Sequence, residues 1–339
     1  MALKRTLIGI LKKKGLKSKL IKEFLVFGFG LILIEGFLWH LEEVGYLGVP
    51  YEWGIRNDIA FKINDCIELF NDPDNKDKIK IVIIGDSVAE CGFKPQYLDQ
   101  LFNKKTISYN LAIAGTASLV HSFIIENLII PKIKPDVIIW DISHPTVFAG
   151  EKDSRNNLTL SSPMGRYYTG NTEDLSFEEI CKYYLLKYSR LYRYRLDLLP
   201  SFFGIKNDVF EYYNSRYNRG WVEKKTSLTT IERNYTFYDP YLYELNEHAV
   251  EMFFDSIKLI QEETSYFLIV FPSHFNYVIT GSTYYSVIYN ISPKYFLDLN
   301  VREDSYIRNL WYDETHLNSN GSLYYTYNIY NKLSQNLLI

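Results

Sequence analysis

Two short segments of the sequence carry residues that could act together in nucleophilic catalysis. Ser87 follows an apolar run directly, in the tripeptide Gly-Asp-Ser, and a serine at the C-terminal end of a strand lies where α/β sheets place their ligands. Asp313 lies three residues before His316. A histidine can take the proton of a serine hydroxyl, and a carboxylate can hold the imidazole in the required tautomer. Each segment alone has a structural explanation, as a tight turn or a helix N-cap; together they predict acyl transfer or ester hydrolysis.

A third segment could stabilise the charge that such a reaction develops. Residues 109–118 end an apolar run in Gly115 before a helical stretch. Its backbone N–H could join that of Ser87 in an oxyanion hole, although a structural turn would have the same pattern. Asp86 and His274 are minor candidates for residues lining the cleft.

These residues need a sheet to bring them together. Five short apolar runs have the length and β-branched content of buried parallel strands, and helical stretches separate several of them. This alternation predicts an α/β sandwich around a mostly parallel sheet. Residues 150–243 form an insertion capping the sheet, and 319–338 a closing helix. The predicted strands are 79–84, 107–111, 137–140, 266–271 and 295–299.

The order of these blocks resembles that of the SGNH (GDSL-like) hydrolase superfamily, from about Lys78 onward and with 150–243 unmatched. The resemblance implies a flavodoxin-like three-layer α/β/α sandwich that uses neither a metal nor another cofactor. It also implies that Ser87 is the nucleophile, with His316 as its base. Asp313 would orient the histidine, and the N–H groups of Ser87 and Gly115 would bind the oxyanion.

One block departs from the family pattern. The family ends its third strand with Gly-x-Asn-Asp, whose asparagine donates to the oxyanion, whereas residues 135–145 here read PDVIIWDISHP. Ser143 or His144 is the candidate for this donor; alternatively, the hole has only two donors. Loss of one donor costs about 10²–10³ in rate, so the departure bears on efficiency and on reaction type.

The N-terminal region has the pattern of a membrane anchor. Residues 1–22 contain eight basic residues and no acidic one, and the apolar run 24–39 is broken only by Glu35. This is close to the roughly 20 apolar residues of a spanning helix. The pattern predicts a cytoplasmic segment at 1–22, a single transmembrane signal anchor at 23–41, a linker with a helical lead-in at 42–77 and an extracytoplasmic catalytic domain at 78–339. A cleaved signal peptide and an amphipathic first helix of a soluble protein are the alternatives.

Composition limits the partners. The net charge of −3 over 339 residues gives no reason to expect nucleic acid. Three widely spaced cysteines form neither a metal motif nor a disulfide framework, which leaves at most one bridge, between Cys66 and Cys91.

An anchored domain of this kind is similar to bacterial envelope-modifying members of the superfamily, such as polysaccharide O-acetyltransferases and the D-alanyl transfer protein of teichoic acid. The main hypothesis is an extracytoplasmic serine acyltransferase or esterase that acts on O-acyl groups of an envelope polysaccharide or other acylated glycan. Its expected intermediate is an acyl-serine, and its expected partner is a multi-spanning membrane O-acyltransferase. The alternatives are a lipid or small-ester hydrolase and a non-catalytic scaffold for an acyltransferase or polymer export complex.

Overall fold

The structure of the protein is a computed structural model. It describes residues 16–43, 57–116, 118–142, 177–193, 218–225, 236–238, 247–272, 277–279, 290–299, 308–313 and 315–337.

A five-stranded parallel sheet forms the centre of the molecule, with the strand order β2-β1-β3-β5-β7. Numbered along the chain, this is the order 2-1-3-4-5 of flavodoxin-like sheets. The predicted α/β sandwich with a parallel sheet is therefore confirmed. The strands are β1 (Ile79–Ile84), β2 (Thr106–Asn110), β3 (Val137–Asp141), β5 (Tyr266–Phe271) and β7 (Phe296–Asp298).

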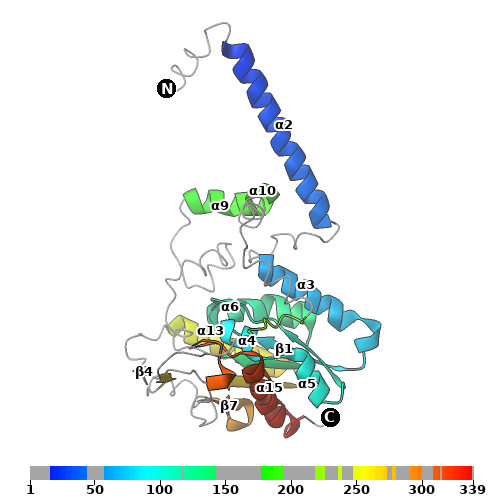
Figure 1. Ribbon diagram of the computed structural model, residues 1–339, viewed down its shortest axis with the longest axis vertical. Helices are drawn as coiled ribbons and strands as arrows, with labels where there is room; N and C mark the ends of the chain where they lie inside the picture. Colours follow the sequence, from blue (N-terminus) through cyan, green and yellow to red (C-terminus); the bar gives the residue numbers. More distant parts are fainter. Residues whose placement is uncertain are drawn as a thin grey trace.

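Helices cover both faces of this sheet, which explains why β1, β3 and β5 are largely apolar. Strand β2 differs, because it buries the polar residues Thr106, Ser108 and Asn110. In β1, Val82 and Ile84 pack into one core layer, and Ile81 and Ile83 into the other. Figure 1 shows α3 and α6 above the sheet and α5 and α15 below it. The first layer packs against α3 (Asn57–Asn71), α6 (Ser118–Ile124), the π-helix η3 (Ile125–Ile133) and α13 (Glu247–Glu263). The second packs against α4 (Ser87–Gly92), α5 (Pro95–Leu101) and α15 (Ser319–Ser334).

Element boundaries differ from the predicted ones by a few residues. Strands β1 and β5 begin and end where predicted, whereas β2 begins at Thr106. The helical stretch predicted after Gly115 runs as α6 and then as a π-helix that contains Pro131. Proline has no N–H for the regular i−4 hydrogen bond, which favours a change of helix type here.

The predicted insertion is described only in parts. It contributes α9 (Phe177–Tyr188), α10 (Arg190–Arg193) and β4 (Thr236–Tyr238). Strand β4 pairs in parallel with β6 (Tyr277–Ile279) as a separate two-stranded sheet. Short 3₁₀ helices elsewhere are η2 (Pro73–Asn75), η6 (Pro293–Tyr295) and η8 (Arg308–Leu310).

The N-terminal helix α2 (Leu16–Glu43) extends away from the sandwich (Figure 1). Its one charge within the apolar run, Glu35, accepts hydrogen bonds from the backbone N–H groups of Arg190 and Leu191, at the start of α10. Within the described ranges, no helix is both long enough and apolar enough to cross a membrane. The span predicted at 23–41 is therefore not supported.

The cysteines are free thiols. Cys66 and Cys91 are both buried and do not form the bridge that the sequence left open.

Candidate active site

Ser87 is the first residue of α4, one turn beyond the end of β1. Asp86 caps this helix, because its Oδ1 accepts a hydrogen bond of 2.8 Å from the N–H of Val88. The turn needs glycine: a Cβ on Gly85 would lie 2.6 Å from the Cβ of Ala89 and 2.9 Å from that of Asp141. This tight packing fixes the direction in which the chain leaves the sheet before Ser87.

A closed loop before α15 carries the other two candidates. A β-bridge joins Trp311 to Leu317, and the N–H of Tyr312 donates to the carbonyl of His316 over 2.9 Å. Asn318 then caps α15 through bonds of 3.0 Å from the N–H groups of Asn320 and Gly321. The Asp-x-x-His spacing is thus a turn held at both ends.

The structure brings the three predicted residues together. His316 Nε2 lies 2.9 Å from Ser87 Oγ, across 229 residues of sequence. His316 Nδ1 lies 2.8 Å from Asp313 Oδ2 and 3.0 Å from Asp313 Oδ1. The side chains of His316 and Asp313 are 25% and 40% exposed. Serine, imidazole and carboxylate therefore form a continuous hydrogen-bonded chain that solvent can reach.

Asp313 is held as a carboxylate. Its Oδ1 accepts hydrogen bonds from the backbone N–H groups of Thr315 (2.8 Å) and His316 (2.7 Å). Partial burial alone would raise the pKa of Asp313. The hydrogen bonds from the His316 ring and from these two N–H groups outweigh that effect, and they hold the pKa well below its usual range.

Gly115 lies in the turn between β2 and α6, with a φ of 72° that favours glycine. Two neighbours attach this turn to the turn that carries Ser87: Ile113 N–H donates to the carbonyl of Gly85 over 2.9 Å, and Thr116 Oγ1 donates to it over 3.5 Å. The predicted oxyanion glycine is therefore anchored to the segment that carries Ser87.

Of the remaining predicted residues, one has a structural role and three lie outside the described residues. Asp86 serves as the N-cap described above. Ser143 and His144, the candidates for the missing donor, lie outside the described residues, as does His274. Their roles stay predictions.

Two buried charged residues near the site carried no sequence signal. Asp141 ends β3 beside Gly85, is fully buried, and has no hydrogen-bond partner for either oxygen among the described residues. Burial raises its pKa well above the usual range, and the charge of Asp86 raises it further. Lys62 of α3, only 2% exposed, donates to Glu90 of α4 (2.5 Å) and to the carbonyl of Ala112 (2.6 Å). It thus joins α4 to the turn before Gly115.

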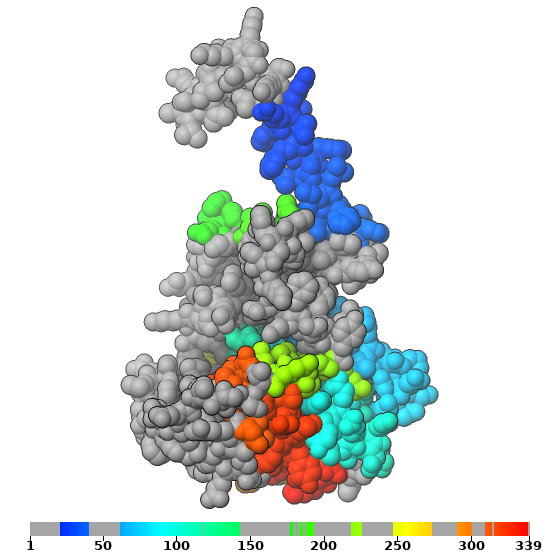
Figure 2. All heavy atoms as spheres, in the orientation of Figure 1, coloured from blue at the N-terminus to red at the C-terminus, as the bar shows by residue number. Residues whose placement is uncertain are grey.

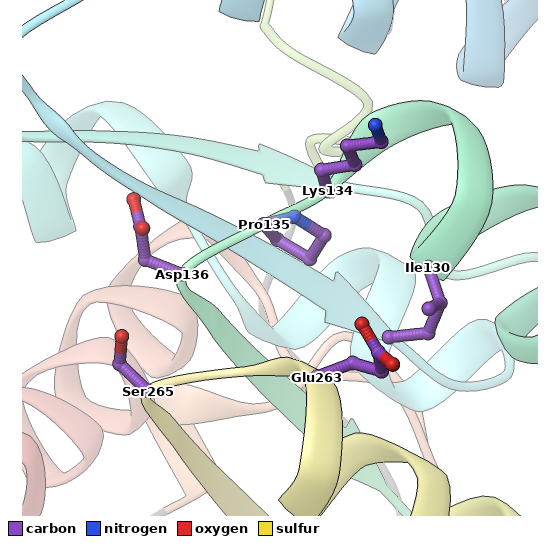
Figure 3. A pocket seen from close by; sticks show the side chains of 6 residues that line it. All are labelled: Ile130, Lys134, Pro135, Asp136, Glu263 and Ser265. Carbon is purple, nitrogen blue, oxygen red and sulfur yellow. The ribbon is translucent and has the colours of Figure 1, made fainter.

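A separate hollow lies at the opposite edge of the sheet (Figure 3). Its volume is about 290 Å³, and Lys134, Asp136 and Glu263 are among its lining residues. Asp136 directly precedes β3, so the hollow is at the amino ends of the strands, away from Ser87. Ligands of such sheets bind at the carboxyl ends. In the part of the chain that the structure describes, no cluster of three His, Cys, Asp or Glu residues could hold a metal ion.

No family model matches the sequence, and no curated protein matches it. The structure is similar to solved structures of an acetylxylan esterase, Axe2 from Geobacillus stearothermophilus. Two catalytic mutants match with a TM-score of 0.37 at 11% and 12% identity, over 75% of this chain and 93% of theirs. A third mutant, described as an acetyl-xylooligosaccharide esterase, matches with a TM-score of 0.36 at 12% identity and the same coverage. At these TM-scores the likeness carries no argument about activity, so the activity rests on the geometry of this site.

Proposed function

We propose that the protein is a serine esterase or acyltransferase of the SGNH type. The observation that carries this proposal is the chain from Ser87 Oγ to His316 Nε2 (2.9 Å) and from His316 Nδ1 to Asp313 Oδ2 (2.8 Å). Because Nδ1 faces an ionised carboxylate, the proton of a neutral ring resides on Nδ1. Nε2 is then an acceptor directed at the serine hydroxyl, as a general base must be.

The reaction follows from this arrangement. Ser87 Oγ attacks the carbonyl carbon of an ester while its proton passes to His316 Nε2. The tetrahedral intermediate collapses, the alcohol leaves with that proton, and an acyl-serine remains. His316 then removes a proton from water or from a sugar hydroxyl, whose oxygen attacks the acyl carbon. The bond from that carbon to Ser87 Oγ breaks, and Oγ takes back the proton from His316 Nε2, which restores the serine hydroxyl. The N–H groups of Ser87 and Gly115 are the proposed donors to the oxyanion.

The proposed substrate is an O-acyl group on an envelope polysaccharide or other acylated glycan. This rests on the resemblance of the sequence to envelope-modifying enzymes, and so does the proposed partner, a multi-spanning membrane O-acyltransferase. The domain would act outside the cytoplasm and beside a membrane. The basic segment 1–22 supports this location, as do the apolar side chains of α2, such as Phe24 (77% exposed) and Val26 (73% exposed).

Labelling with a fluorophosphonate tests the chemistry. We expect the wild-type protein to be labelled, and Ser87→Ala and His316→Ala to lose labelling. Ser334→Ala is the matched control, because Ser334 is an exposed serine at the end of α15. Labelling that persists in Ser87→Ala would remove this serine from the mechanism. A folded wild-type protein that neither is labelled nor hydrolyses any ester would favour the scaffold hypothesis.

Substrate comparison separates the two enzymatic hypotheses. An envelope-glycan enzyme should release acetate from acetylated oligosaccharides faster than it hydrolyses long-chain lipid esters. The opposite preference would favour the lipid or small-ester hydrolase.

Location needs its own test. We expect the full chain in the membrane fraction, and a reporter enzyme fused after residue 339 to be active only outside the cytoplasm. A full chain found wholly in the soluble fraction, or a reporter active inside the cell, would overturn the proposed location.

A further inference from the structure

A short piece of the predicted insertion lies against the active-site elements. Residues 219–224, which we call the strap, contact β2, α4 and the start of α15. In Figure 2 this region is the yellow-green group of spheres, which adjoins the red of α15 and the cyan of the α4–α5 region. The sequence predicts that the whole interval 150–243 caps the sheet. The strap instead joins the two halves of the site.

The strap first attaches to the end of the nucleophile helix. The N–H of Val222 donates to the carbonyl of Glu90 (3.1 Å), and Trp221 Nε1 donates to the carbonyl of Cys91 (2.9 Å). Carbonyls in the last turn of a helix have no intrahelical partner, and α4 is only six residues long. The strap therefore supplies donors that fix the C-terminal end of the helix that begins at Ser87.

The strap then attaches to the segment that carries the histidine. The N–H of Ser319 donates to the carbonyl of Lys224 over 2.9 Å, and Ser319 Oγ donates to Glu223 Oε1 over 3.0 Å. Ser319 begins α15, three residues after His316. Two consecutive parts of the strap thus hold α4 and the His316 loop.

The strap is also fixed in place on β2. The N–H of Asn110 donates to the carbonyl of Arg219 over 2.9 Å, and Arg219 forms an ion pair with Asp99. Gly220 has a φ of +83°, and a Cβ there would lie 1.9 Å from the carbonyl oxygen of Asn110. Only glycine allows so close an approach.

We propose that the strap is a positioning element, which holds Ser87 and His316 at reacting distance; its catalytic relevance rests on the proposed function. The two residues lie on separate elements that are distant in sequence, and reacting groups need placement within about 0.5 Å. A third segment bonded to both elements, and fixed on the sheet, provides this placement. The strap residues themselves do not enter the chemistry.

Two substitutions loosen the strap in different ways. Trp221→Phe keeps an aromatic ring and removes the donor to Cys91, and Gly220→Ala forces the chain away from Asn110. We expect each to lower kcat for an activated acetyl ester, by up to about 10²-fold for a displacement near 1 Å, with little change in KM. Lys225→Ala is the control, since this lysine follows the strap, is 81% exposed, and makes only an exposed ion pair of 3.8 Å with Glu223, which contributes little. Rates are compared well below the melting temperature of each variant.

A double-mutant cycle separates positioning from simple destabilisation. If the strap acts through the serine–histidine pair, Trp221→Phe should add no further loss to the residual activity of His316→Ala. An equal loss in both backgrounds would overturn the proposal, and so would a kcat of Trp221→Phe and Gly220→Ala equal to that of the wild type.

One measurement does not depend on ester activity. The ¹⁵N resonance of His316 Nε2 reports its hydrogen bond to Ser87 Oγ, and we expect it to shift in both strap variants but not in Lys225→Ala. An unchanged resonance in the strap variants overturns the positioning role even if the protein proves to be no esterase. If the wild-type protein shows no labelling that depends on Ser87, the proposed function is overturned but the positioning role of the strap is not.

Discussion

Replacing Asp313 by asparagine should reverse the tautomer of His316. Asp313 Oδ1 accepts backbone N–H groups from Thr315 (2.8 Å) and His316 (2.7 Å). The amide oxygen of an asparagine must take this place, because its NH₂ group would meet two donors. The NH₂ group then occupies the position of Oδ2, 2.8 Å from His316 Nδ1. The amide oxygen lies farther from Nδ1, at 3.0 Å, and already accepts two backbone N–H groups. Nδ1 therefore accepts from the nearer NH₂ group, and the ring proton moves to Nε2 and faces Ser87 Oγ at 2.9 Å.

A histidine with its proton on Nε2 cannot accept the proton of the serine. In a serine protease, the corresponding change lowers kcat by about 10⁴. That factor is about 5.4 kcal/mol of activation free energy, at about 1.36 kcal/mol for each tenfold. The fold should be little affected, because the Asp313 side chain is 40% exposed and the backbone bonds to the amide oxygen persist.

The assay is hydrolysis of an activated acetyl ester, together with the rate of fluorophosphonate labelling. Both rates should fall in Asp313→Asn while the melting temperature stays close to that of the wild type. Thr315→Val is the control: its hydroxyl lies 3.2 Å from both Asp313 Oδ1 and His316 Nδ1, and its loss leaves the tautomer unchanged, so a decrease below about tenfold is expected. Asp313→Asn activity within tenfold of the wild type would refute the tautomer argument.

Three further predictions concern stability. Lys62→Met leaves the partly buried Glu90 carboxylate without its ion-pair partner, and should lower the free energy of unfolding by up to about 3 kcal/mol in urea titrations, with Lys62→Arg as the milder control. Gly85→Ala brings a Cβ to 2.6 Å from that of Ala89, and should lower both stability and labelling; a variant equal to the wild type would disprove the packing argument. The pKa of Asp141 is raised in the folded state, so its contribution to stability is fully present below the ordinary carboxyl pKa of about 4 and is lost as pH rises towards the folded-state value. Melting temperatures measured from pH 4 to 9 should therefore decline less steeply in Asp141→Asn than in the wild type, and parallel curves would contradict this assignment. Asp313 has the opposite sign, since its lowered pKa makes its contribution disappear as pH falls below about 4.

The sequence predicted those parts of the fold that depend on local pattern. The β-branched run Ile79–Ile84, which is polar only at Lys80, matches its strand, because a strand buried on both faces has few polar positions to obscure its bounds. The order of motifs along the chain also placed Ser87 and His316 at the same edge of the sheet. Parallel strands bring their carboxyl ends to one edge, so residues that follow different strands can meet there.

Other parts of the site depend on contacts that leave no local pattern. Asp141 is the last residue of an apolar strand, and only its burial beside Gly85 distinguishes it from an ordinary surface aspartate. Lys62 lies on an amphipathic helix, where a lysine normally faces water, yet it is buried. Its partner Glu90 lies 28 residues further along the chain. The strap could not be predicted from the sequence for the same reason, since its proposed role comes from contacts with three distant segments.

The separation of Ser87 and His316 also determines when the site can form. His316 lies 229 residues after Ser87, and a ribosome adds about 5–20 residues per second. A growing chain therefore carries its serine for roughly 10–50 s before the histidine has been synthesised. During this interval Ser87 has no histidine within reach. The hydrogen-bonded chain from Ser87 to Asp313 can form only once the segment before α15 has docked on the sheet, so the candidate site is among the last parts of the fold to be completed.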